Sequence, residues 1–341
     1  MKENVVVIGG GASGLEASRR LRDLGYIPVL IEKDAVLGGH LAHWNRLFPQ
    51  MIAAKDVLDP LISDLDGIKC FTSTEVVSIN RLKDTYVVKF SNGLSAQVRC
   101  ILVTTGFQLF PAQKKQEYGY GIYDRVITNA DLENYFNTGK DERVMNPEVI
   151  GFVHCVGSRD EKAGNRQCSK VCCATAVKQA MEIKEKFPDA IVYCFYMDLR
   201  MFGRGYEDMY LKAQKEYGIR FLRGRVSEVS EDINGRLVVK ADDTLLGKPV
   251  KISMDLLVLM SGIVAPEGNA NLARMIKVLP GEDGFFSAAN PVSDPCLSTR
   301  DGIFFAGAAT GPKTLPETLS EGRAAAMEID AYMKRNCRSK K

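Results

Sequence analysis

The 341-residue sequence has no long hydrophobic run, no large excess of charge of either sign and only three histidines. Its apolar stretches, such as Leu256–Met260, fall well short of the ~20 residues that span a bilayer. A net charge of +3 gives no electrostatic case for nucleic acid, and the N-terminus shows no apolar core of a signal peptide. We therefore expect a folded cytoplasmic protein of about two domains, with no membrane span and no nucleic-acid partner.

The first 32 residues have the pattern of a dinucleotide-binding βαβ unit. The β-branched run Val5–Ile8 predicts a strand buried in a parallel sheet, and residues 9–14 (GGGASG) follow it with G-x-G-x-x-G spacing. This spacing permits a tight turn at Gly9, close approach of a pyrophosphate at Gly11 and close helix packing at Gly14. A helix over 15–24 and a strand over 27–31 follow, and Glu32 is placed to accept hydrogen bonds from ribose hydroxyls. The cofactor bound here should therefore contain an adenosine diphosphate group, as FAD does and FMN does not.

The rest of the chain repeats this plan. Residues 67–106 and 218–262 each read as short alternating strands that finish in an apolar strand and a glycine. A strand over 149–153, a helix over 169–187 and a strand over 190–196 form a second βαβ unit. The fold class is thus α/β, with two Rossmann-like dinucleotide-binding domains in the thioredoxin-reductase-like arrangement of two-dinucleotide flavoproteins.

The expected boundaries follow from the two copies. Residues 1–112 and 280–341 form the FAD-binding domain, since a strand over 299–307 and a helix over 316–334 return to it. Residues 147–265 form the second module, and 113–146 and 266–279 are expected to be linkers. His154 belongs to a strand, so its side chain should point away from that of Cys155.

Four of the nine cysteines lie within 19 residues, at Cys155, Cys168, Cys172 and Cys173. They occupy the strand–helix loop of the second βαβ unit, where a second glycine fingerprint would have to stand if NAD(P)H bound there. Clustered cysteines in a cytoplasmic protein indicate metal ligands or redox groups. The helix N-terminus behind them lowers thiolate pKa, which favours metal binding.

Three kinds of cysteine site remain open at this point. Adjacent Cys172 and Cys173 suit a [4Fe–4S] cluster, because each sulfur can bind a different iron. A zinc site needs all four sulfurs on one ion, which an adjacent pair serves poorly. A redox disulfide is the third interpretation, but the C-x2-C motif of disulfide reductases is absent and a Cys172–Cys173 disulfide would need a strained ring.

The residues also carry a family resemblance. The chain resembles the A-type subunit of heterodisulfide reductase, and the related A-type subunit of the quinone-interacting membrane-bound oxidoreductase, over nearly its whole length. The matching segments are 155–160 (CVGSRD), 168–173 (CSKVCC), 178–180, 38–40, 48–49, 117–121, 126–128, 202–207, 283–286 and 311–313. It lacks the cysteines after Phe48-Pro49 and the inserted ferredoxin-like domain of the methanogen type. In this it is more similar to the heterodisulfide-reductase-like complexes of sulfur-oxidising microbes, and electron bifurcation is not implied.

The resemblance implies FAD in the first domain and a [4Fe–4S] cluster bound by the four clustered cysteines. Lys313 would place a positive charge near the flavin, whereas Ala308 stands where such proteins usually carry a ribityl-binding aspartate. The implied cofactor-binding residues are Gly9, Gly11, Ala12, Ser13, Gly14, Glu32, Lys33, Gly38, Gly39, His40, Thr105, Gly106, Gly307, Lys313 and Thr318.

The implied function is electron transfer between flavin and partner subunits, without catalytic residues for substrate chemistry in this chain. The partners would be iron–sulfur and disulfide-reductase-type B and C subunits of the same complex, in sulfur metabolism, with the chain itself a homodimer. Two alternatives are a stand-alone NAD(P)H-dependent disulfide or sulfur reductase and a non-catalytic scaffold with a structural metal site.

Overall fold

The computed structural model describes residues 3–338, except for the side chains of residues 337 and 338. The chain forms two compact units. The first comprises Met1–Ala42, Lys55–Gln108 and Val264–Lys341, and the second comprises His43–Ala54 and Leu109–Ile263. Each unit contains one five-stranded parallel sheet and one three-stranded antiparallel sheet, so the duplicated plan expected from the sequence is confirmed.

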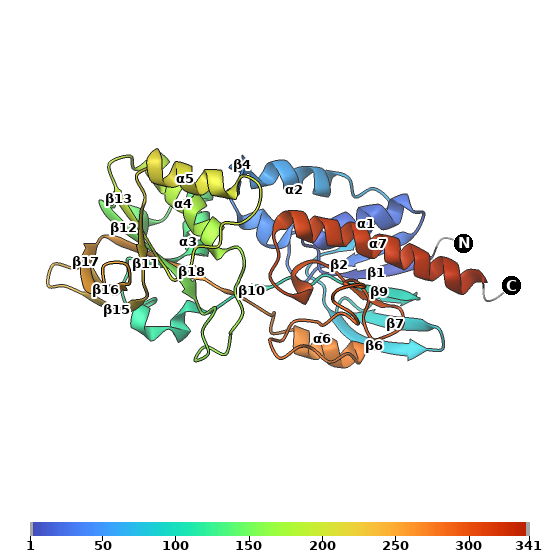
Figure 1. Cartoon of the computed structure of the whole chain (residues 1–341). Helices are drawn as coiled ribbons and strands as arrows, with labels where there is room; N and C mark the ends of the chain where they lie inside the picture. Colours follow the sequence, from blue (N-terminus) through green and yellow to red (C-terminus); the bar gives the residue numbers. More distant parts are fainter. Residues whose placement is uncertain (1–2, 339–341) are drawn as a thin grey trace. The chain divides into compact units, whose positions relative to one another are not determined.

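In the first unit, the parallel sheet has the strand order β20-β9-β1-β2-β5. Its central strand β1 is almost entirely apolar and buried, as expected for a strand with neighbours on both sides and helices on the faces. Helices α1 and α7 lie side by side along this sheet (Figure 1). The elements are β1 (Asn4–Ile8), α1 (Ala12–Asp23), β2 (Ile27–Ile31), β5 (Lys69–Phe71), β9 (Cys100–Val103), β20 (Ile303–Phe305) and α7 (Leu315–Arg338).

The remaining elements of the first unit surround this sheet. The antiparallel sheet packs its apolar face into the same core as the parallel sheet, through residues such as Ile79 and Val88. Helix α6 closes the core with Leu272 and Ile276. These elements are α2 (Ala54–Ser63), β6 (Val76–Leu82), β7 (Thr85–Phe90), β8 (Ser95–Val98) and α6 (Asn269–Ile276).

The second unit repeats the arrangement with the strand order β11-β18-β12-β13-β14. Its parallel strands are β11 (Val126–Thr128), β12 (Val149–Val156), β13 (Ile191–Tyr196), β14 (Arg220–Arg223) and β18 (Leu256–Ser261). The helices are α3 (Asn129–Thr138), α4 (Cys172–Lys186) and α5 (Tyr206–Lys215). The antiparallel strands are β15 (Val226–Glu231), β16 (Leu237–Asp243) and β17 (Lys248–Met254). Short strands are β3 (Arg46–Leu47), β4 (Ile52–Ala53), β10 (Gln108–Leu109) and β19 (Ile263–Val264).

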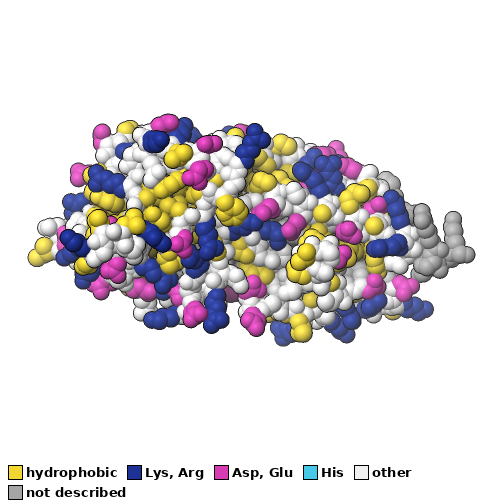
Figure 2. Space-filling view, viewed as in Figure 1, with side chains coloured by type: hydrophobic (Ala, Val, Ile, Leu, Met, Phe, Trp, Pro, Cys, Tyr) yellow, Lys and Arg dark blue, Asp and Glu magenta, His cyan; other side chains and the backbone are white. Residues whose placement is uncertain are grey.

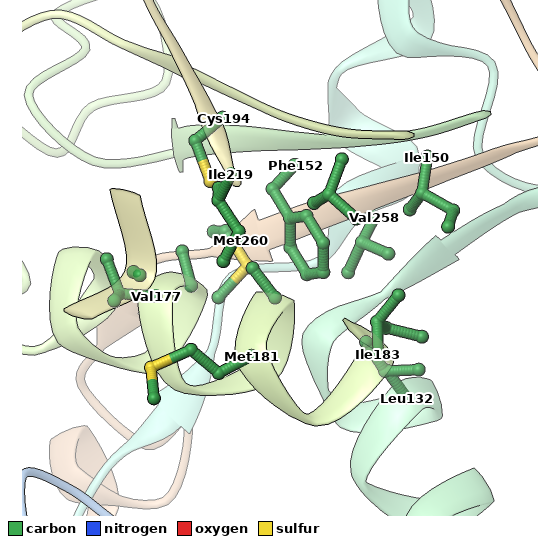
Figure 3. Close-up of a cluster of buried hydrophobic side chains, with 14 of the residues drawn as sticks. Leu132, Ile150, Phe152, Val177, Met181, Ile183, Cys194, Ile219, Val258 and Met260 are labelled. Atoms are coloured by element: carbon green, nitrogen blue, oxygen red, sulfur yellow. The ribbon is translucent and has the colours of Figure 1, made fainter. Parts of the chain in front are cut away.

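The core of the second unit lies between α4 and its sheet. Val177 and Met181, one turn apart on α4, belong to the same buried apolar cluster as Phe152 of β12 and Met260 of β18 (Figure 3). All four side chains are at most 2% exposed. Because α4 is fixed by this apolar face, the position of its first turn over the end of β12 is fixed as well.

The segments expected as linkers are instead part of the two units. Residues 113–146 supply β11, which pairs with β18, and α3, whose Leu132 is fully buried. Residues 266–279 supply α6 of the first unit. Both segments contain short elements whose apolar residues are too few to show a clear period, so only tertiary packing reveals them.

Two surface features complete the fold. None of the helices within residues 3–338 is long and apolar enough to cross a bilayer. On the face drawn in Figure 2, basic and acidic side chains are interspersed rather than gathered by sign.

Three charged side chains are buried together in the second unit. Lys178 of α4 forms ion pairs with Glu133 of α3 and, at 3.2 Å, with Glu182 one turn further along α4. Glu133 also accepts hydrogen bonds from Gln179 Nε2 (2.6 Å) and from the backbone N–H of Asn45 (2.8 Å). Both carboxylate oxygens of Glu182, by contrast, are buried without a hydrogen bond. Burial raises the pKa of Glu182 to about 7.

Glu182 should make the free energy of unfolding depend on pH, and Glu182→Gln should remove this dependence. The pKa is about 7 in the folded state and ~4.3 in the unfolded chain, so folding takes up a proton between these values. The contribution of Glu182 to stability is therefore present below about pH 4 and is lost as the pH rises to 7. Denaturant unfolding should show the Glu182→Gln protein gaining stability relative to the parent between pH 5 and pH 8. Glu216→Gln, at an exposed ion pair, should show no such gain; equal pH profiles for all three proteins would contradict the prediction.

Candidate functional site

The glycine loop of the first unit joins β1 to α1 in three residues, Gly9–Gly11. A Cβ atom at Gly9 would lie 2.4 Å from Thr104 O, and one at Gly14 would lie 1.9 Å from Gly9 O. These two glycines are therefore required by packing. A Cβ atom at Gly11 would meet nothing within 4 Å. The space in front of Gly11 lies at the N-terminus of α1, where free N–H groups favour a phosphate.

Glu32 holds the glycine loop in place through hydrogen bonds to backbone N–H groups. Its carboxylate accepts hydrogen bonds from the backbone N–H of Gly10 (2.6 Å) and of Asp34 (2.9 Å), and the side chain is buried. Gly38 N–H donates to Gly10 O at 2.8 Å, which brings the turn at Gly38 and Gly39 against the loop. The hydrogen bond from Gly10 N–H to Glu32 was not expected from the sequence, because the spacing of a motif does not show which backbone groups a side chain contacts.

A buried hydroxyl at the start of α1 has no hydrogen-bond partner among residues 3–338. Ser13 is 5% exposed, and its Oγ makes no hydrogen bond. The C-terminal turn is packed against it, since a Cβ atom at Gly307 would lie 2.8 Å from Ser13 Cβ and 3.2 Å from Thr318 Cγ2. A buried hydroxyl without a partner is costly, so Ser13 indicates a polar ligand at this helix N-terminus.

The structure shows which groups surround Lys313 and where Ala308 lies in the C-terminal turn. The Lys313 ammonium lies 3.4 Å from Glu321 Oε1 and donates to Thr310 Oγ1 at 2.5 Å. Its charge is thus balanced by Glu321, whose other oxygen accepts a hydrogen bond from Gly307 N–H at 2.9 Å. Ala308 is buried in the short 3-10 turn that follows Gly307.

The turn after β9 lies at the same end of the sheet. Thr105 Oγ1 donates to Asn269 Oδ1 at 3.0 Å, and a Cβ atom at Gly106 would meet nothing within 4 Å. The His40 ring stacks on Phe107 with centroids 4.1 Å apart, and its Nε2 lies 2.9 Å from Phe107 O. Ala12 opens α1, whereas Lys33 is exposed beyond β2. The carboxyl ends of parallel strands form the usual binding edge of such a sheet.

Three of the four clustered cysteines meet in the second unit. Cys155 lies near the end of β12 with its backbone at φ +59°, and Cys172 and Cys173 begin α4. The Cys172 thiol shares hydrogen bonds with both other sulfurs. Hydrogen bonding to Cys172 lowers the pKa of Cys155 to about 7 and that of Cys173 to about 4, and the same hydrogen bonds raise the pKa of Cys172. Cys155 and Cys173 therefore have thiolate character, the form that binds metal ions.

Cys168 occupies the loop beside this group. Its sulfur is partly exposed and accepts a hydrogen bond from Lys170 N–H at 3.3 Å. Among residues 3–338, no group of three or more His, Cys, Asp and Glu side chains is arranged to hold a metal ion. The structure thus brings Cys155, Cys172 and Cys173 together, but the four cysteines are not arranged around a common metal position.

His154 is closer to the cysteines than the alternation of a regular strand suggests. It is 7% exposed, the Cys173 and Cys194 thiols lie next to its ring, and neither ring nitrogen has a hydrogen bond of good geometry. The pairing register of β12 shifts between Val153 and Val156, and the positive φ of Cys155 ends the regular alternation there. Both side chains consequently face the group at the start of α4.

The loop between β12 and α4 is held in a strained conformation. Cys155, Arg159 and Lys170 all have positive φ, at 59°, 53° and 62°. Asn165 Nδ2 donates to Gly157 O at 2.9 Å, and Ser169 Oγ accepts from Ile263 N–H at 2.7 Å. Non-glycine residues in the left-handed region cost about 1–3 kcal/mol each and cluster at functional sites.

The comparison with protein families finds a match to the pyridine nucleotide-disulphide oxidoreductase model over residues 1–134. Among curated proteins, the chain is 33% identical to one iron-sulfur A-type subunit of CoB--CoM heterodisulfide reductase from Methanopyrus kandleri, form 1, over 98% of this chain and 64% of the relative. It is 32% identical to form 2 of the same subunit from that organism, over 95% of this chain and 63% of the relative. The second alignment spans 415 positions, more than this chain has, so the relative carries inserted residues within the matched region.

Solved structures share the fold at low sequence identity. Lactococcus lactis thioredoxin reductase matches with a TM-score of 0.67 and 17% identity, covering 98% of this chain and 100% of that one. T. acidophilum thioredoxin reductase matches with a TM-score of 0.65 and 16% identity, covering 97% and 99%. The thioredoxin-reductase-like arrangement predicted from the sequence is therefore confirmed. The chain is thus similar over nearly its whole length to A-type subunits of heterodisulfide reductase, and it spans slightly less than two thirds of the length of these curated relatives.

Proposed function

We propose that the chain is an FAD- and [4Fe–4S]-containing electron-transfer subunit of a heterodisulfide-reductase-like complex. The observation that carries the proposal is the loop from β12 to α4. At this position the first unit has a three-residue glycine turn, whereas the second unit has fifteen residues and four nearby cysteines. A second phosphate cradle is replaced by thiols, which favours a metal cofactor over NAD(P)H.

The first unit fits FAD in three respects. Gly11 leaves room at the N-terminus of α1, Ser13 Oγ is a buried hydroxyl in need of a partner, and Glu32 stands at the end of β2. We assign the diphosphate to the glycine loop and the ribose to Glu32. Bound FAD would supply a carrier that takes up electrons in pairs and releases them singly.

The cysteine loop fits an iron–sulfur cluster by its donor chemistry. Cys155 and Cys173 are sulfur donors with lowered thiol pKa values, Cys172 lies between them, and Cys168 is in the same loop. Both Methanopyrus kandleri relatives are named as iron-sulfur subunits. We assign all four cysteines as cluster ligands.

The assembly that we propose follows the relatives. Their names describe subunits of heterodisulfide reductases, so we propose iron–sulfur and disulfide-reductase-type B and C subunits as partners of this chain. Substrate chemistry would lie on those partners, in a cytoplasmic complex of sulfur metabolism that contains this chain as a homodimer. The residues inserted in the matched region of one relative are absent from this chain, which supports a single cluster within that region.

The FAD assignment predicts a specific effect of Glu32→Ala. Loss of the charged acceptor for Gly10 N–H and for the ribose should cost about 1.5–3 kcal/mol, or roughly tenfold or more in FAD affinity. Flavin released by heat from the parent should be identified as FAD by chromatography. The variant should release less FAD per protein chain. Asp34→Ala, at the exposed acid two residues later, should retain the parental FAD content. Release of FMN from the parent would refute the assignment.

The cluster assignment predicts that Cys173→Ala loses or degrades the cluster while FAD remains. Each cysteine of the adjacent pair would bind a different iron, so neither can replace the other. Iron analysis and EPR of the reduced protein should show the loss, and the second unit should become less heat-stable because metal binding contributes to folding. Cys70→Ala, in β5 of the first unit, is the matched control and should change neither cofactor. Full iron content with an unchanged EPR signal in Cys173→Ala would exclude Cys173 as a ligand.

A further inference from the structure

The hydrogen bonds of Ser158 and Arg159 reach Cys155, the residue before Cys168, and a residue that Cys173 contacts. Ser158 donates its N–H to Cys155 O at 3.2 Å. The Arg159 N–H donates to the carbonyl of Gln167, the residue before Cys168, at 3.0 Å. Its guanidinium Nη2 donates to Asp198 at 2.7 Å, and the Asp198 carbonyl accepts from Cys173 Sγ at 3.8 Å. These contacts place the guanidinium at the cysteine loop.

One edge of this guanidinium lacks a partner. Arg159 Nη1 is buried and makes no hydrogen bond to the residues that the structure describes, although Nη2 of the same group is paired. An unsatisfied buried N–H of a charged group is among the costliest defects in a protein interior. The hydrogen bond to Asp198 and, to a smaller extent, the nearby Cys155 and Cys168 raise the pKa of Arg159.

The positive charge at this position is not cancelled by its ion pair. Asp198 is about half exposed and is shared between Arg159 and Arg223, whose Nη2 lies 3.5 Å from Asp198 Oδ1. The backbone of Arg159 is also held at φ +53°, a conformation that non-glycine residues rarely adopt. The cysteine loop therefore contains an arginine with a strained backbone, excess positive charge and one guanidinium nitrogen without a hydrogen bond among the described residues.

We propose that Arg159 is a positioning residue that donates a charge-assisted hydrogen bond from Nη1 to a sulfur of the cluster and thereby raises its reduction potential. This inference rests on the proposed function, because it requires the cluster to be present. One-electron reduction adds one negative charge to a cluster, and hydrogen bonds and positive charge near its sulfurs favour that state. Arg159 would stabilise the reduced state more than the oxidised one.

The test compares reduction potentials of whole-chain variants, measured by dithionite titration with EPR detection after iron has been quantified. Arg159→Gln should keep its iron and show a lower midpoint potential, with the equilibrium shifted about tenfold toward the oxidised cluster, or ~59 mV for one electron. Arg159→Lys keeps the charge but loses the planar donor pair, so its potential should lie between those of Arg159→Gln and the parent.

Arg166→Gln is the matched control, because it removes the same charge from the same loop. Arg166 is 78% exposed and pairs with the equally exposed Glu161, so its removal should leave the potential unchanged. Arg159→Gln with full iron and the parental potential would overturn the inference, as would equal shifts in Arg159→Gln and Arg166→Gln. If Arg159→Gln loses its iron, the potential of Arg159→Lys provides the test. A potential below that of the parent supports the inference, and a potential equal to that of the parent overturns it. A parent protein without iron would instead contradict the proposed function.

Discussion

The left-handed backbone of Cys155 is the constraint on which the cysteine site depends. At φ +59° the chain leaves the regular alternation of β12, and the Cys155 thiol lies against the first turn of α4, beside that of Cys172. The position of that turn is fixed by the apolar face of α4, where Val177 and Met181 pack on the sheet. A strained residue on one side and a well-packed helix on the other thus bring the sulfurs together. The cost of the strain is met by the core of the second unit.

The junction between strand and helix is built differently in the two units of this duplicated scaffold. In the first, three glycine residues join strand to helix, and the helix N-terminus is left open for a phosphate group. In the second, the corresponding helix N-terminus carries Cys172 and Cys173, and a loop that folds back on itself covers it. The same helix dipole that favours a phosphate also favours thiolates, so both helix N-termini suit negatively charged groups.

The sequence predicted the parts of the fold that rest on local patterns. The strands Asn4–Ile8 and Ile27–Ile31, the fingerprint between them and the repetition of the plan were all readable, because buried parallel strands and glycine turns have strong sequence signals. The expected helix over 169–187 begins later, at Cys172, because the positive φ of Lys170 keeps residues 169–171 in the loop. The roles of 113–146 and 266–279 were not readable, because their short elements depend on packing against distant strands.

Within the candidate sites, the sequence identified residue types but not their partners. The bond from Gly10 to Glu32, the balance of Lys313 by Glu321 and the pairing of Arg159 with Asp198 join residues far apart in the chain or across a turn. Only tertiary structure sets such contacts. Arg159 stood in the CVGSRD segment, but nothing in the segment shows that one edge of its guanidinium is buried without a partner.

The central claim is that this chain combines a flavin with an iron–sulfur cluster, and one measurement tests it most directly. Protein purified without oxygen should be analysed for iron, zinc and flavin, and its EPR spectrum recorded before and after reduction. We expect about four iron atoms and about one FAD per chain, little zinc, and a cluster signal that appears on reduction. Zinc without iron, or iron absent from protein that retains its flavin, would contradict the claim.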